Sequence, residues 1–213
     1  MEPGLPATPP HPIWLARHLP SAHASAGRIT STEFGTWSLE YDEAGLADGA
    51  TANRELVELA ARCTVLSSPL RRAIETAALA GSADPLLMPV LARAIRPDVP
   101  LRFVRLRPKT WRGLTRVVWR FGWAPTIETQ AQARERAAIA AEKLAVLAVE
   151  SELLVIGHNY FNTLIGTALR RRGWCGPRRP VTRHGRANAY LPPALRTAPW
   201  RPSTPAERLA ATG

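Results

Sequence analysis

The chain has few of several residue types, and each shortage argues against a class of protein. Its only two cysteines, Cys63 and Cys175, cannot make the disulfide framework of a small secreted protein, so we expect a reducing, cytoplasmic location. The first residues show no basic segment followed by an apolar one, which argues against a secretory signal. No apolar run approaches the roughly 20 residues that a membrane-spanning helix needs. We therefore expect a globular protein with no membrane span.

Lysine is also scarce, and arginine supplies almost all of the positive charge. The chain has 28 basic residues against 17 acidic ones, a formal net charge of +11, and Lys109 and Lys143 are its only lysines. Arginine binds phosphate through a planar fork of donors. A genome biased toward arginine codons would give the same composition, so charge alone is weak evidence for an anionic partner. We expect no nucleic-acid partner, and the sequence leaves the oligomeric state unknown.

The hydrophobic pattern predicts a layered α/β domain. Short apolar runs typical of buried strands cover 13–16, 64–67 and 152–157, with weaker candidates at 88–91 and 187–191. Helical spacing predicts helices over 53–62, 69–80, 109–121, 130–149 and 160–172. We expect the polar, turn-rich residues 21–48 to form a loop. The alternation of strands and helices favours a largely parallel sheet.

The composition also suggests the limits of the domain. The domain is expected to cover residues 13–191, with 84–125 inserted as a lid. Residues 1–12 hold five prolines and are expected to be a flexible lead-in, and 192–213 are expected to be a loose tail.

The predicted helix at 109–121 has two opposite faces. Its apolar face carries Trp111, Leu114, Val118 and Phe121, and its basic face carries Lys109, Arg112, Arg116 and Arg120. We favour a lid whose apolar face is buried and whose basic face is open to solvent or to an anionic partner. The alternative is a surface for membranes or nucleic acid, in which Trp119 and Trp123 lie near the basic stripe.

Three motifs follow predicted strands or open the helices after them. Arg17 and His18 end the first apolar run, Arg72 lies in the helix after the second, and His158 ends a later one. Parallel strands present chemistry at their carboxyl ends, so we predict that these four side chains converge on one pocket. Two histidines and two arginines there would suit a phosphoryl group.

The order of these motifs resembles the histidine phosphatase superfamily, the phosphoglycerate-mutase-like proteins. The motifs are Arg17-His18 after a first strand, Ser-x-x-x-Arg-Ala-x-x-Thr-Ala from Ser68 to Ala77, and Gly157-His158 after a late strand. The resemblance covers about residues 13–190 and points to a divergent, bacterial-type member. It implies a three-layer α/β/α sandwich with a mostly parallel central sheet and a helical lid.

The resemblance also implies a reaction. His18 would be the nucleophile that becomes phosphorylated, Arg17 and Arg72 would grip the phosphoryl oxygens, and His158 would complete the pocket. A neutral imidazole is an adequate nucleophile near neutral pH, and flanking arginines stabilise a transferring phosphoryl group. We expect a metal-independent phosphohydrolase without a cofactor, acting on a phosphorylated small molecule or a phosphoprotein.

The sequence departs from the family pattern around these residues. Leu19 stands where the family usually has glycine, and Ala24 stands where it usually has asparagine. Residues 91–98 lack the usual glutamate that acts as general acid, with Ala94 or a neighbour in its place. Asn159 stands where other members carry an aspartate.

Asp98 is the nearest candidate for a displaced acid, although a solvated turn residue beside prolines fits it better. A general acid typically contributes about 10²–10⁴ in rate, so we expect substrates with good leaving groups. The alternative function is a degenerate phosphatase that binds an anion or a partner without turnover. His23 and His184 lack such a context and are expected on the surface.

Overall fold

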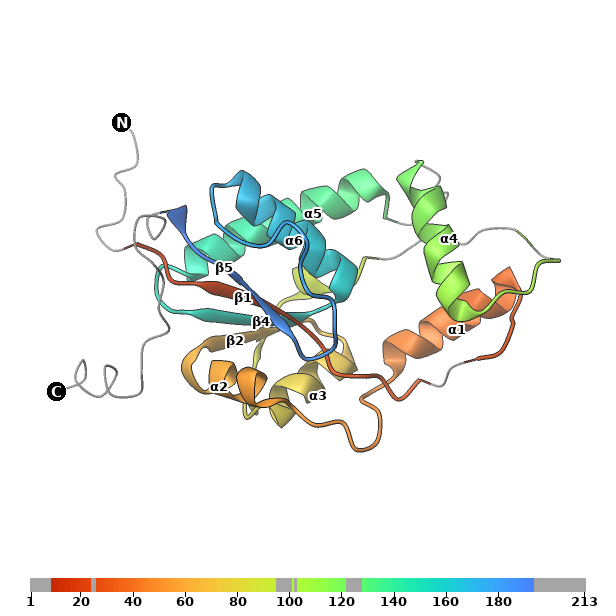
Figure 1. The fold of residues 1–213 in the computed structure, drawn as a ribbon, viewed down its shortest axis with the longest axis horizontal. Helices are drawn as coiled ribbons and strands as arrows, with labels where there is room; N and C mark the ends of the chain where they lie inside the picture. Colours follow the sequence, from red (N-terminus) through yellow and green to blue (C-terminus); the bar gives the residue numbers. More distant parts are fainter. Residues whose placement is uncertain (1–8, 24–25, 95–100, 102, 122–127, 194–213) are drawn as a thin grey trace.

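A computed structural model of the chain describes residues 9–23, 26–94, 101, 103–121 and 128–193 (Figure 1). The strands are β1 (Ile13–Arg17), β2 (Thr64–Ser67), β3 (Leu86–Leu87), β4 (Leu153–Gly157) and β5 (Ala187–Tyr190). The α-helices are α1 (Ser31–Glu43), α2 (Arg54–Arg62), α3 (Arg71–Leu79), α4 (Pro108–Arg120), α5 (Gln130–Leu147) and α6 (Asn159–Arg171), and η1 (Pro89–Leu91) is a 3₁₀ turn.

The five strands of the described residues form one sheet in the order β3-β2-β4-β1-β5. Strands β3, β2, β4 and β1 are parallel, and only β5 runs antiparallel, along the edge beside β1. The central strands β1 and β4 are almost continuous runs of buried apolar residues, as a sheet covered on both faces requires. The predicted α/β fold with a mostly parallel sheet is therefore confirmed.

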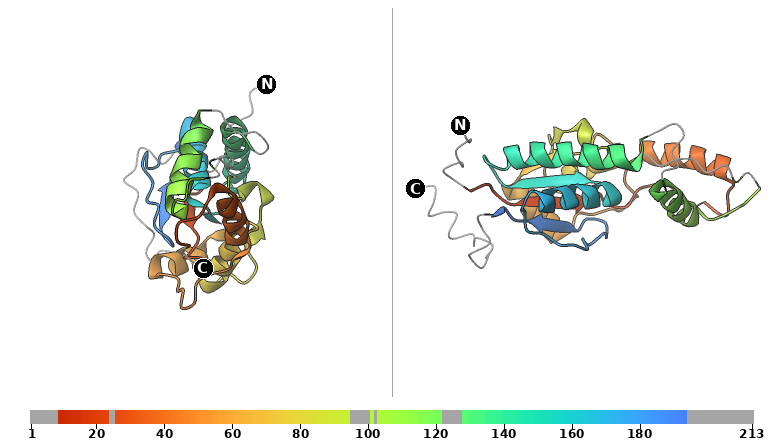
Figure 2. Two further views of the ribbon diagram at one scale, coloured as in Figure 1. Left: turned by 90° about the vertical axis from the view of Figure 1, so that its right-hand side faces the viewer. Right: turned by 90° about the horizontal axis from the view of Figure 1, so that it is seen from above.

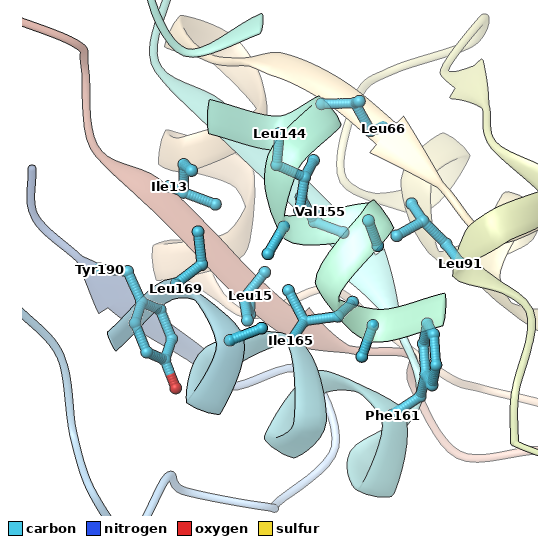
Figure 3. Packing of buried hydrophobic residues seen from close by; sticks show 14 of the residues in the cluster. Ile13, Leu15, Leu66, Leu91, Leu144, Val155, Phe161, Ile165, Leu169 and Tyr190 are labelled. Atoms are coloured by element: carbon cyan, nitrogen blue, oxygen red, sulfur yellow. The ribbon is translucent and has the colours of Figure 1, made fainter. Parts of the chain in front are cut away.

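Helices cover both faces of the sheet, which gives three layers (Figures 1 and 2). On one face α5 and α6 pack over Leu15 and Val155, and Figure 3 shows Leu144 and Ile165 reaching into this core. On the other face the alternate strand residues, such as Ile156, pack under α2 and α3. Because successive side chains of a strand point to opposite faces of the sheet, the core consists of two apolar clusters, one on each face.

Residues 21–48 were expected to form a loop, and this expectation is wrong. Helix α1 occupies Ser31–Glu43 and begins with a capping box, in which the Thr30 side chain accepts from the backbone of Glu33 while the Glu33 side chain accepts from that of Thr30. Its apolar residues are few, so hydrophobic periodicity gives no signal, but the Thr-x-x-Glu spacing is itself a helix-start signature. Helix α1 lies beside α4, and the pair extends beyond one end of the sheet (Figures 1 and 2).

The strand expected at 88–91 is displaced toward the N-terminus. The strand is the two-residue β3, and Pro89–Leu91 forms the 3₁₀ turn η1. Proline has no N–H to give to a sheet, so Pro89 stops the ladder and begins the turn. The other predicted strands and helices form within one or two residues of the expected bounds.

Helix α4 is present as predicted, but its buried side differs from the expected one. Trp111 is fully buried, and Leu114 and Val118 are partly buried against α1. Phe121, at the end of the helix, is 83% exposed, so that part of the prediction is wrong. Trp119, which the alternative of a membrane or nucleic-acid surface placed near the basic stripe, is fully buried in the main core, and its indole N–H donates to the Glu128 carbonyl. The helix therefore buries two sides, one on α1 and one on the core.

Most of the expected lead-in and tail, and part of the expected lid, lie outside the described residues. No helix in the described part of the chain has both the length and the apolar character to cross a membrane.

Candidate functional site

A cavity of about 730 Å³, including the solvent at its mouth, opens at the carboxyl ends of β1 and β4. The structure brings all four predicted site residues, Arg17, His18, Arg72 and His158, to its lining. Arg17 is the last residue of β1, His18 follows it, and His158 comes directly after β4. Since β1 and β4 are parallel and in register up to Arg17 and Gly157, the two histidines emerge side by side, with ring centroids 5.3 Å apart.

The imidazole of His18 is held in one orientation by its own loop. Its Nδ1 lies 2.6 Å from the Leu19 carbonyl oxygen, which can only accept, so Nδ1 carries the proton. Its Nε2 lies 3.4 Å from Nε of Arg72, which can only donate, so Nε2 presents its lone pair. Two neighbours thus fix the tautomer in which Nε2 is the nucleophilic atom.

His18 is only 2% exposed and stands among cations. Burial, and next the charge of Arg72, lowers the pKa of His18 from 6.5 to about 2. Burial likewise lowers the pKa of His158, followed by the influence of His18 and Arg72. Both imidazoles are therefore neutral near pH 7, as a nucleophile must be.

Ser68 holds the second histidine in place. Its Oγ is hydrogen-bonded to Nε2 of His158 at 2.8 Å, and it also accepts from the backbone N–H of Leu70 at the start of α3. A serine at a helix start commonly satisfies free backbone donors in this way. Its bond to His158 is a second role, which sequence spacing did not indicate.

Arg72 is fully buried, and protein acceptors occupy most of its guanidinium. Nε donates to His18, Nη1 donates to the backbone carbonyls of Tyr41 (2.7 Å) and Asp42 (3.2 Å), and Nη2 donates to the Asp42 carboxylate at 3.3 Å. A guanidinium has five N–H donors, so one N–H of Nη2 is left for a ligand. The acceptors come from the end of α1, the helix that the sequence analysis missed.

Arg17 has a donor without an acceptor. Its Nη1 donates to the Thr182 carbonyl at 2.7 Å, and its guanidinium is hydrogen-bonded to the Tyr41 hydroxyl. Its Nε is buried and has no hydrogen-bond partner among the residues that the structure describes. A buried unpaired donor is costly and is rare in native structures, so an oxygen-rich ligand is its natural partner.

Further cations face the cavity from the lid region. Arg112 and Arg116 of α4 line it, and Arg116 is also exposed, which agrees with the predicted face open to solvent or to an anionic partner. Packing of Trp111 against Phe34 sets the rotation of α4, and this turns the two arginines toward the cavity. The sequence analysis predicted that the basic face of this helix could meet an anionic partner. The spacing of the residues does not predict how α4 is rotated relative to the cavity.

Sequence reasoning also missed His184, which it placed on the surface. The residue is half-buried, its Nδ1 is 2.8 Å from the His18 carbonyl oxygen, and its ring centroid is 5.2 Å from that of His18. It lies in the loop before β5, and only the antiparallel pairing of β5 with β1 brings that loop to the site. His23 is also partly buried, with its ring 4.7 Å from that of Trp37.

Among the described residues that line the cavity, none carries a carboxyl group. Ala94, at the expected place of the family's acid, is 5% exposed and lies in the wall. Asp42 pairs with Arg72 and Arg93 behind the lining. Asp98, the candidate displaced acid, and Ala24 fall outside the described residues. The described residues also contain no group of three histidine, cysteine or acidic side chains placed to hold a metal ion.

Comparison with known proteins identifies the fold. The chain is similar to the product of the open reading frame Rv3214 of Mycobacterium tuberculosis, with 26% identity, 75% of this chain and 79% of that chain covered, and a TM-score of 0.51. The chain has the histidine phosphatase fold. The resemblance found in the motifs is thus confirmed by the arrangement of the elements.

Two other solved structures, both of phosphatases, are also similar. The mycobacterial glucosyl-3-phosphoglycerate phosphatase Rv2419c has 16% identity, with 76% of this chain and 80% of that chain covered, and a TM-score of 0.49. The Entamoeba histolytica phosphoserine phosphatase, solved with 3-phosphoglyceric acid, has 15% identity, 76% and 80% coverage, and a TM-score of 0.48. No family model and no curated protein matches the chain.

The low pKa of His18 predicts how stability changes with pH. Below pH 6.5 the unfolded chain protonates this histidine while the folded chain does not, down to about pH 2, so stability must fall as the pH falls. From pH 6.5 to pH 5 the cost is about 2 kcal/mol, at about 1.4 kcal/mol per pH unit. Urea unfolding at both pH values should show wild type losing that much more stability than His18→Asn. An equal loss in both proteins would mean that His18 is protonated in the folded state.

Proposed function

We propose that this chain is a phosphohydrolase that works through a phosphohistidine at His18. Its substrate is a phosphorylated small molecule or a phosphoprotein. One observation carries the proposal, namely that the unprotonated Nε2 of His18 lies beside Arg72 at a cavity lined by arginines. The unpaired Nε of Arg17 supports it, because a phosphoryl oxygen would supply the missing acceptor.

The reaction has two displacements at phosphorus. In the first, Nε2 of His18 forms a bond to phosphorus, and the bond from phosphorus to the leaving oxygen breaks. Arg17 and the remaining N–H of Arg72 stabilise the charge on the transferring group, and His158 closes the other side. In the second, water attacks phosphorus, the P–N bond breaks, and inorganic phosphate leaves. The protein needs no positive charge beyond its own side chains for either step.

Segment 84–125 acts as a lid in this proposal. Its described part includes α4, which packs on α1 through Trp111 and turns Arg112 and Arg116 toward the cavity. The lid would admit an anionic substrate and then surround it with guanidinium groups. Specificity would come from this segment, because loops and insertions carry the variable contacts of a shared fold.

A second function is favoured by two features of the site. Protein acceptors occupy four N–H donors of Arg72, and none of the described lining residues has a carboxyl group. Both features weaken catalysis more than they weaken anion binding. In this alternative the chain binds a phosphorylated ligand or partner without turnover.

Replacing His18 separates the two functions. We expect His18→Ala to abolish phosphatase activity on a broad panel of phosphorylated metabolites, together with any acid-labile phosphoenzyme. The fold should persist, because a cavity histidine contributes little to core packing. His11→Ala is the matched control, since His11 precedes β1, at the end of the strand opposite to His18. Turnover retained in His18→Ala would contradict the proposal, and a wild type that binds phosphate without any turnover would favour the alternative.

The described lining of the cavity has no carboxyl group to act as general acid, and this predicts which substrates react. Acetyl phosphate, whose leaving group needs little protonation, should be turned over much faster than glycerol 3-phosphate. Ala94→Glu places a carboxyl group in the wall and should raise kcat/KM for glycerol 3-phosphate at least tenfold, whereas Ala94→Gln should not. If Ala94→Glu gives no gain while Asp98→Asn causes a large loss, Asp98 is the acid instead.

A further inference from the structure

Tyr41 is a cavity residue that neither the motifs nor the proposed function uses. It lies in the last turn of α1, a helix that follows the first motif in the chain, and it lines the same cavity as His18. Its ring is stacked on Trp37, with centroids 5.5 Å apart, and Trp37 is stacked in turn on Phe34. This aromatic row fixes the phenol against the phosphate-binding arginines.

Three guanidinium groups surround the phenol. Arg17 is hydrogen-bonded to its hydroxyl oxygen, and the central carbons of Arg72 and Arg112 lie 4.4 Å and 5.4 Å from its ring centroid. Arg72 also contacts Nε2 of His18. The Tyr41 hydroxyl therefore lies beside Arg17, one of the two arginines that bind the phosphoryl oxygens in the proposed function. Because its oxygen accepts from Arg17, its own proton is free to point at a ligand.

The other hydroxyl groups of the described lining have different neighbours. The hydroxyl of Tyr160 accepts from Gln130 of α5 at 3.2 Å, and the guanidinium over its ring is that of Arg116, at 5.3 Å, rather than Arg72, which contacts His18. Ser38 accepts from Arg93 at 3.1 Å, and an aliphatic hydroxyl is a much weaker acid than a phenol. Tyr41 is thus the best-placed proton donor among the described lining residues.

We propose that Tyr41 is the general acid of this site, in place of the missing carboxyl group. The inference rests on the proposed function at His18. In the first displacement the bond from phosphorus to the ester oxygen breaks, its electron pair goes to that oxygen, and the proton of the Tyr41 hydroxyl follows. The Arg17 guanidinium, which is hydrogen-bonded to this oxygen, lies beside the negative charge that forms there. In the second displacement the attacking water gives its proton to this phenolate, which restores Tyr41.

The chemistry of a phenol agrees with an acid-poor site. A phenol is a weaker acid than a carboxylic acid with a raised pKa, so its help is smaller. The enzyme would still prefer good leaving groups, yet it would turn over alkyl phosphates at a measurable rate. The contribution of Tyr41 should grow as the leaving oxygen becomes more basic, and this dependence distinguishes an acid from a residue that only positions Arg17.

Tyr41→Phe removes the hydroxyl and keeps the stacked ring, so it tests this dependence in the full chain. We expect kcat/KM for glycerol 3-phosphate to fall about 30- to 100-fold. For p-nitrophenyl phosphate, whose leaving group needs little protonation, we expect a fall of only a few-fold. Because one protein sample serves both substrates, a folding defect would lower both rates together. Tyr160→Phe removes the other phenol of the described lining, and a fall of this size confined to glycerol 3-phosphate in that variant instead would overturn the inference.

Each other outcome is decisive. Equal losses on both substrates would show that Tyr41 positions Arg17 and does not donate a proton, which overturns the inference. No loss on glycerol 3-phosphate would overturn it as well, and a large loss on Asp98→Asn would then identify the acid. In both cases acid-labile phosphohistidine from p-nitrophenyl phosphate would persist, so the proposed function would stand. Absence of phosphohistidine in wild type would instead reject the proposed function, and this inference with it.

Discussion

The buried guanidinium of Arg72 connects the parts of the site. A cation with no exposed surface needs acceptors on every side, since an unpaired buried charge is very costly. The end of α1 supplies them through the Tyr41 and Asp42 carbonyls and the Asp42 carboxylate. The remaining side of the guanidinium faces Nε2 of His18. One side chain therefore fixes α1 against the sheet, and after burial its charge is the next cause of the low pKa of His18.

This arrangement explains how a site with several departures from the family pattern is still ordered. Leu19 replaces a small residue, yet its carbonyl holds Nδ1 of His18, and its backbone N–H donates to Thr76 of α3. The carboxyl group that is missing at Ala94 is not replaced by another in the described lining. The aromatic row of α1 occupies the adjacent wall and brings the Tyr41 hydroxyl to Arg17. The site is thus cationic and contains no carboxyl group among the described lining residues, and it holds His18, the proposed nucleophile, in a neutral form.

The sequence predicted the sheet well because β1, β2 and β4 are buried runs bounded by polar residues. The positions of Arg17, His18, Arg72 and His158 follow from those strands, since parallel strands deliver their next residues to one edge. Helix α1 was missed because its burial is local and its apolar periodicity is weak. His184 and the rotation of α4 could not be predicted, because each depends on a long-range contact, β5 with β1 in one case and Trp111 with Phe34 in the other.

The central claim is that Nε2 of His18 takes the phosphoryl group. The most direct measurement is to mix the protein with a phosphate ester, stop the reaction with alkali, and locate the phosphoryl group by ³¹P NMR and peptide mass spectrometry. Our account predicts a phosphohistidine at His18, substituted on Nε2, because Nδ1 carries the ring proton and donates a hydrogen bond to the Leu19 carbonyl. Phosphate on Nδ1, on Ser68 or on His158 would contradict it.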